Sequence, residues 1–97
     1  MRELTFVLGP NQVPLSSQDV AKLNAWFWGE SSIAGRQQLR EPLTAAIKTG
    51  DDVVVRDNDG REVLLAILDR MNEACEITTD GLRKLHEVAR LPIAGGG

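Results

Sequence analysis

A short apolar run, a helix-capping residue and a helix-period apolar pattern follow one another three times in this sequence. The three units are Val13–Leu15 leading into Ser17–Trp28, Val53–Val55 leading into Gly60–Cys75, and Cys75–Thr79 leading into Asp80–Arg90. Strand-like runs that alternate with amphipathic helices are typical of a sheet packed against a helical layer. The repeated unit therefore predicts a sheet combined with helices, and we assign the chain to the α+β class.

The length of 97 residues fits a single domain with one modest core. We assign residues 1–91 to that domain and residues 92–97 to a flexible glycine-rich tail. The net charge of −3 gives no overall attraction to nucleic acid or anionic lipid, and a single cysteine cannot form an internal disulfide. Because the chain has neither a signal-peptide pattern nor an apolar run near the ~20 residues of a membrane span, we expect a cytoplasmic protein.

The N-terminal part predicts two strands and a helix. Leu4–Leu8 is rich in β-branched and aromatic residues, and a glycine-proline turn separates it from a second strand over Gln12–Leu15. Pro14 cannot donate to a sheet ladder, so the second strand should lie at an edge. Ser16 or Ser17 then caps a helix that runs to Trp28, and Gly29 suits the left-handed position after its end.

The middle of the chain predicts two helical pieces and a central strand. After the connector over residues 30–35, we expect a helical turn over Ala34–Arg40 and a new helix with Pro42 at its first position, ending before Gly50. The unbroken valines of Val53–Val55 indicate burial on both faces, and hence the centre of the sheet.

The segment Arg61–Cys75 allows two interpretations. As a strand after a turn at residues 56–60, it resembles, over Leu39–Leu68, the valine hairpin of small antitoxins of the Phd type, which implies a DNA-binding regulator. As a helix, it carries an apolar stripe of Leu64, Leu68, Met71 and Cys75, with a capping box from Asp59 to Glu62. We favour the helix, because residues 63–68 lack the alternation of a half-buried strand.

A last helix, from Thr79 or Asp80 to Arg90, has a basic side formed by Arg83, Lys84 and Arg90. Together with the preceding helix it is similar to a helix-turn-helix DNA reader, although a solvated charged face explains the same pattern. Cys75 and His86 are the one nucleophile and base pair available, and we place Cys75 in the core instead. No metal-ligand or phosphate-binding spacing occurs, so we expect no catalysis, metal or cofactor.

The end of the chain resembles that of another family. The run Glu87-Val88-Ala89-Arg90-Leu91-Pro92 before the glycines is similar to the end of the small subunit of molybdopterin synthase, a β-grasp sulfur carrier. That resemblance implies a carrier terminus at Gly96 and Gly97, with Gly97 bearing an adenylate or thiocarboxylate. A third glycine and the helical middle of the chain depart from the family pattern, and a passive tail is the alternative.

These patterns combine into a three-stranded sheet with about four helices in the order ββααβαα. On the first helix, Phe27 continues the core stripe, while Trp26 and Trp28 lie about 100° to either side of it. The three rings span about 200°, more than a surface helix normally buries, so at least one tryptophan should be exposed. We therefore expect a non-catalytic interaction or adaptor domain that binds another protein, or a second copy of itself, through Trp26 and Trp28.

Overall fold

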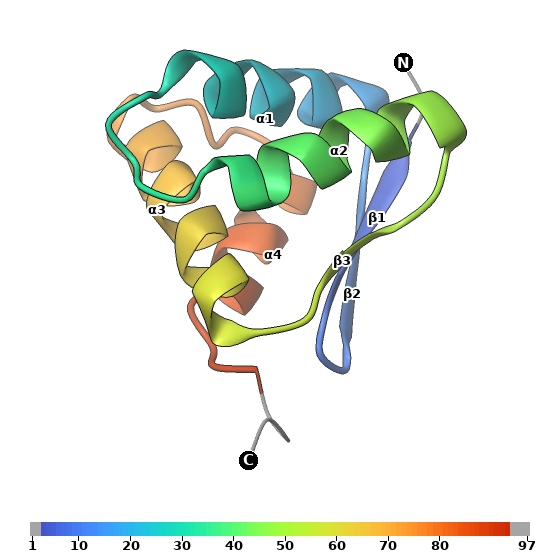
Figure 1. Ribbon diagram of the computed structural model, residues 1–97. Coiled ribbons are helices and arrows are strands. Elements are labelled where there is room, and N and C mark those ends of the chain that lie inside the picture. The colour runs from blue at the N-terminus through green and yellow to red at the C-terminus, as the bar shows by residue number, and fades with distance from the viewer. Residues whose placement is uncertain (1–2, 94–97) are drawn as a thin grey trace.

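The computed structural model describes residues 3–93, which form three strands and four helices. In chain order they are β1 (Leu4–Leu8), β2 (Asn11–Leu15), α1 (Ser17–Gly29), α2 (Gln37–Thr49), β3 (Val53–Val55), α3 (Asn58–Glu73) and α4 (Asp80–Ala89). The predicted α+β class and the order ββααβαα are confirmed. Helices lie on one side of the sheet, and the residues buried in each strand alternate with more exposed ones, so the core is the layer between sheet and helices (Figure 1).

β1 is the central strand, because the sheet order is β2-β1-β3. It pairs antiparallel with β2 and parallel with β3. Leu8 pairs with Asn11 across a two-residue loop, where Gly9 has φ +60°, as the first position of a tight hairpin turn can require. The predicted edge position of β2 is confirmed, and Pro14 is exposed there.

The prediction that Val53–Val55 forms the central strand is wrong. β3 has three residues and lies at an edge, with Val53 and Val55 buried and Val54 45% exposed. Asp52 and Arg56 flank it and are exposed. Charged flanks and short length are common at sheet edges, whereas the longer β1 can pair along both sides.

Side-chain caps begin three of the four helices, α1, α3 and α4. Ser16 Oγ accepts a hydrogen bond from the amide of Asp19 at 3.2 Å, and Thr79 Oγ1 accepts one from the amide of Leu82 at 3.2 Å. The Thr79 hydroxyl also donates to the buried carboxylate of Asp19 at 2.9 Å, which joins the starts of α1 and α4. The Ser16 contact confirms one of the two caps predicted for α1, and the Thr79 contact agrees with the predicted start of α4 at Thr79 or Asp80.

The predicted start of α3 is wrong by about two residues. Its cap is Asp57, whose carboxylate accepts a hydrogen bond from the amide of Gly60 at 2.8 Å. Asp59 therefore lies inside the first turn and does not cap the helix with Glu62. Because Asn58 follows β3 after only two residues, the nearest side-chain acceptor, Asp57, takes the capping position.

The predicted break at Pro42 is also wrong, since α2 runs continuously through it. Leu39, one turn before Leu43, is buried, and both side chains belong to the core. Burial of Leu39 stabilises the first turn of the helix and offsets the amide donor that proline lacks. The predicted stop is confirmed, because Gly50 has φ +81° and its amide donates to the carbonyl of Ala46.

The helical interpretation of residues 61–75 is confirmed for most of its length. Leu64, Leu68 and Met71 have no exposed surface. Cys75, which we predicted at the end of their stripe, is instead exposed and has φ +60°. The amides of Cys75 and Glu76 donate to the carbonyls of Asn72 and Met71, at 3.0 and 2.8 Å, and this bonding pattern is a Schellman motif with Cys75 in its left-handed position.

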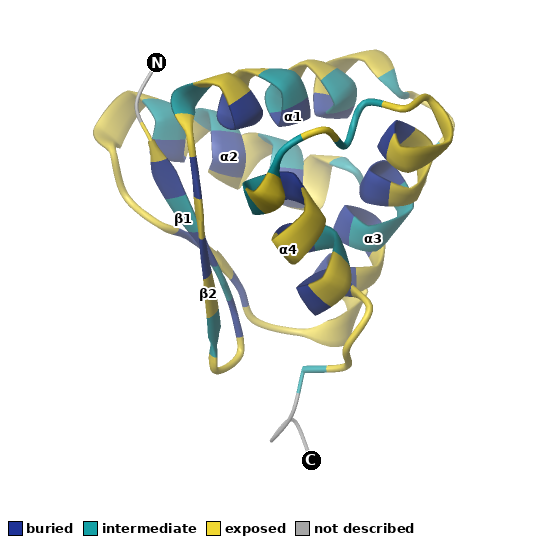
Figure 2. Cartoon of the chain, turned by 180° about the vertical axis from the view of Figure 1, so that it is seen from behind, coloured by how far each residue is buried: buried dark blue, intermediate teal, exposed yellow. Residues whose placement is uncertain are grey.

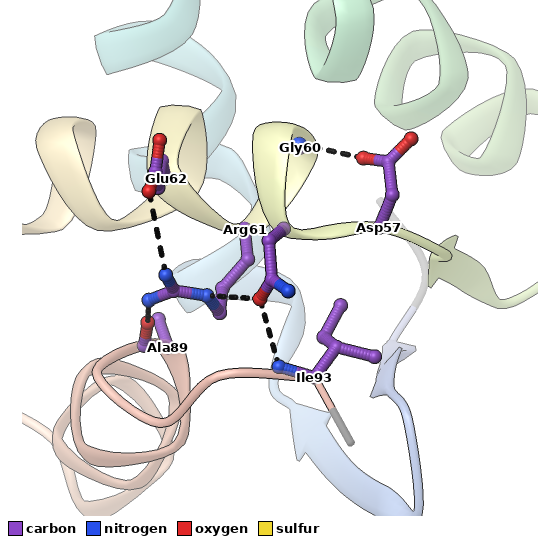
Figure 3. A network of polar contacts seen from close by, with 7 residues as sticks. Asp57, Gly60, Arg61, Glu62, Ala89 and Ile93 are labelled. Carbon is purple, nitrogen blue, oxygen red and sulfur yellow. Dashed lines mark hydrogen bonds and ion pairs between the residues drawn. The ribbon is translucent and has the colours of Figure 1, made fainter. Parts of the chain in front are cut away.

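A buried arginine joins α3 to the end of α4 (Figure 3). Arg61 is 8% exposed, and its guanidinium donates to the carbonyl of Ala89 at 2.8 Å and to Asn58 Oδ1 at 2.9 Å. Asn58 Oδ1 also accepts a hydrogen bond from the amide of Ile93 at 2.8 Å. The network thus holds the chain beyond α4 against the start of α3.

Candidate partner-binding surface

The three consecutive aromatic residues at the end of α1 lie in three different environments. Phe27 is fully buried, Trp26 is partly buried against the core, and Trp28 is 54% exposed. The helical rotation of about 100° per residue turns the two tryptophans to opposite sides of Phe27. At least one ring is therefore exposed, as its position on the helix predicts.

Arg36 fixes the end of α1, which positions Trp28. Its guanidinium donates to the carbonyls of Phe27 and Trp28, at 2.9 and 3.0 Å. A cation at the C-terminal end of a helix also interacts favourably with the helix dipole. Because the Arg36 side chain bonds the last carbonyls of α1, the helix can end without a left-handed residue. Gly29 is the last residue of the helix and has no positive φ, so the predicted left-handed position of Gly29 is wrong.

The indole of Trp28 is held by a second arginine, from α2. The guanidinium carbon of Arg40 lies 4.1 Å from the centroid of the Trp28 ring, a distance typical of a cation–π interaction. Arg40 Nε is buried and has no hydrogen-bond partner among the described residues. Stacking thus orders the ring while leaving more than half of the residue's surface exposed.

Trp28 lines a shallow hollow of about 360 Å³ together with Arg40, Glu41, Thr44, Ala45 and Lys48 of α2. We call these six residues the Trp28 surface. Its charged members are two cations and one anion, so it is locally basic on a chain of net charge −3. An apolar ring with a basic rim suits a partner that offers an apolar side chain beside carboxylate or carbonyl oxygens.

Trp26 lines a separate hollow of about 280 Å³ with Ala25, Gly29 and Glu30. The Ser32 hydroxyl and amide both donate to the Glu30 carboxylate, and the hydroxyl contributes most to lowering the pKa of Glu30 below its ordinary value. The two tryptophans that we predicted as one binding site thus line different hollows. Trp28 is the more accessible of the two.

The other candidate residues lie on α3, on α4 and in the turn after α3. His86 Nε2 lies 2.8 Å from Asp69 Oδ1, between α4 and α3, while Cys75 lies in the turn after α3. Among residues 3–93, no group of three or more histidine, cysteine or acidic side chains could hold a metal ion, and no helix is long and apolar enough to span a membrane. On the basic side of α4, Arg83 pairs with Asp80 at 3.3 Å.

The remaining sequence resemblances depend on the middle and the end of the chain. Residues 58–73 form a helix, whereas an antitoxin hairpin and a β-grasp sheet both need strands after β3. Gly96 and Gly97, the candidate carrier terminus, lie outside the described residues. No protein-family model, curated protein or solved structure matches this chain at a significant level.

Proposed function

We propose that this chain is a non-catalytic protein-binding domain and that its Trp28 surface is the contact with a partner protein. The observation that carries the proposal is the 54% exposure of a tryptophan whose ring is already stacked on Arg40. Tryptophan and arginine are, with tyrosine, the residues most enriched among those that dominate binding energy. A ring ordered before binding loses less conformational entropy when it enters a pocket of the partner.

The experiment compares the wild-type chain with Trp28→Ala and with Leu91→Ala as a matched control. Leu91 is 56% exposed and does not belong to the Trp28 surface. The Leu91→Ala substitution therefore removes a comparably exposed apolar side chain at another place on the molecule. Each protein is immobilised and incubated with a lysate of the native host, and recovered proteins are quantified by mass spectrometry. A candidate whose recovery depends on Trp28 is then purified and titrated by calorimetry.

We expect Trp28→Ala to weaken binding of that partner by roughly 30-fold, the loss that corresponds to a hot spot of about 2 kcal/mol. Leu91→Ala should leave the dissociation constant unchanged within about twofold. Because the indole is mostly exposed, Trp28→Ala should also retain the wild-type circular dichroism spectrum. The proposal fails if no recovered protein distinguishes Trp28→Ala from Leu91→Ala.

A further inference from the structure

The outer edge of β3 is open. Within residues 3–93, β3 pairs only with β1. The two edges of the sheet can be compared in the figures, since β3 is nearer to the viewer in Figure 1 and β2 is nearer in Figure 2. A hollow of about 160 Å³ lies against this edge, lined by Gln38 and Leu39 of α2, by residues 54–57 and by Gly60. The outer side of β3 therefore has no strand partner among the described residues, and part of it borders a hollow.

The two edges of the sheet differ in their capacity to accept such a strand. β2 carries an exposed proline, Pro14, which cannot donate a hydrogen bond to an incoming chain. β3 and its flanks, Asp52 to Arg56, contain neither proline nor lysine. Its short length and the charges of Asp52 and Arg56 still limit pairing, so an incoming strand must satisfy those charges. Val54 points to the face of the sheet away from the helices and is 45% exposed.

The charges that flank β3 are complementary to those of a second β3 running antiparallel to it. If two copies pair about a two-fold axis at Val54, Asp52 of each copy lies opposite Arg56 of the other. Because side chains alternate along a strand, these two residues share the open face with Val54. Directly opposed residues of opposite charge stabilise an antiparallel pair. Sliding the strands by two residues in either direction removes both ion pairs, so the charges select one register.

We propose that two copies of this chain associate through antiparallel pairing of β3 with β3, centred on Val54. The pairing joins the sheets into one of six strands. Val7 is the partner of Val54 on β1, so four valines, two from each copy, would form an apolar row on the open face. In the same register, Asp51 of each copy would lie opposite Asp57 of the other, on the face of the sheet opposite to that of Val54. Both residues are exposed. This repulsion and the short strands predict a weak, concentration-dependent dimer.

A charge swap tests the pairing by sedimentation velocity over a concentration series to about 1 mM, a range suited to interfaces of the small class. Asp52→Arg and Arg56→Asp should each weaken the dimer at least about fivefold, because each variant sets like charges opposite one another. The double variant exchanges the charges and should restore wild-type association. Glu73→Arg and Lys84→Asp, at exposed positions on α3 and α4, make the same charge changes and should have no effect.

A disulfide tests the register independently of the charges. Directly opposed residues of an antiparallel pair have Cα atoms about 4.5–5.5 Å apart, within the range of a disulfide. In a Cys75→Ser background, Val54→Cys should form a covalent dimer on mild oxidation. Gln12→Cys, exposed on β2 and on the same face, should not. Circular dichroism of every variant checks that it is folded.

Several outcomes overturn the proposal: a wild-type chain that stays monomeric to about 1 mM, a double variant no stronger than the single ones, or equal oxidation of the Val54→Cys and Gln12→Cys chains. The interface uses no residue of the Trp28 surface. Trp28→Ala should therefore leave self-association unchanged, and the two proposals can fail separately.

Discussion

Replacing Arg61 by methionine tests how strongly the buried guanidinium holds α3 to α4. Methionine retains most of the aliphatic volume but removes the hydrogen bonds to the Ala89 carbonyl and to Asn58 Oδ1. Asn58 Oδ1 keeps the amide of Ile93 as a donor, so the main loss is at Ala89, whose carbonyl is left without the bond from Arg61. Leaving a buried acceptor unpaired costs about 1–3 kcal/mol, and a hydrogen bond from a charged donor contributes about 1.5–3 kcal/mol.

Part of that loss is offset, because the variant no longer buries a charged group. We therefore expect Arg61→Met to lower the free energy of unfolding by about 2–3 kcal/mol. For a domain of this size, that loss corresponds to a fall in Tm of roughly 8–24 °C. The measurement is urea denaturation followed by circular dichroism, with thermal denaturation as a second probe.

Arg70→Met is the matched control, since Arg70 is exposed on the same helix. It should change the free energy of unfolding by less than about 0.5 kcal/mol. Arg61→Lys keeps the charge but cannot reproduce the forked geometry, and should fall between the two methionine variants. If Arg61→Met is no less stable than Arg70→Met, the network contributes nothing to stability and the reasoning is refuted.

Three further substitutions test the packing. Leu68→Ala removes a fully buried side chain and should cost about 2–5 kcal/mol in chemical denaturation; a loss below about 1 kcal/mol would place α3 outside the core. Cys75→Gly relieves the left-handed backbone and should raise the free energy of unfolding by about 1 kcal/mol, whereas no gain would mean that the position is unstrained. Gly81→Ala places a methyl group 3.0 Å from Asp19 Oδ2, so we expect a loss of about 1–3 kcal/mol, and a Tm equal to that of the wild type would contradict this contact.

Local chemistry explains why most elements could be predicted from the sequence. Ser16 and Thr79 cap helices with their own side chains, and Gly50 ends α2 through its own conformation. The exposure of one tryptophan followed from the rotation of an α-helix. Each of these predictions depends on residues within one or two turns of one another.

Several of the errors concern contacts between separate elements. Three valines look the same at the centre or at the edge of a sheet, and the pairing of β1 with both neighbours decides between them. Arg36 and Arg61 bond carbonyls at the ends of α1 and α4, and no periodic pattern marks an arginine for such a role. Arg40 likewise reaches Trp28 only because α1 and α2 pack together. The candidate surface is therefore defined by tertiary contacts, although the sequence predicted that Trp26 or Trp28 would be exposed.

The central position of β1 sets the order of events during folding. The β1–β2 hairpin closes through two residues and can form within about 1–10 μs. The parallel pair requires Val53 to reach Phe6 across about 47 positions, and the length-dependent part of the loop-closure cost is roughly 3.4 kcal/mol. On a ribosome that adds about 5–20 residues per second, β3 follows β1 by roughly 2–9 s. Throughout that interval the β1 edge of the hairpin has no native partner. We therefore expect non-native strand pairing of the nascent chain to occur mainly at β1.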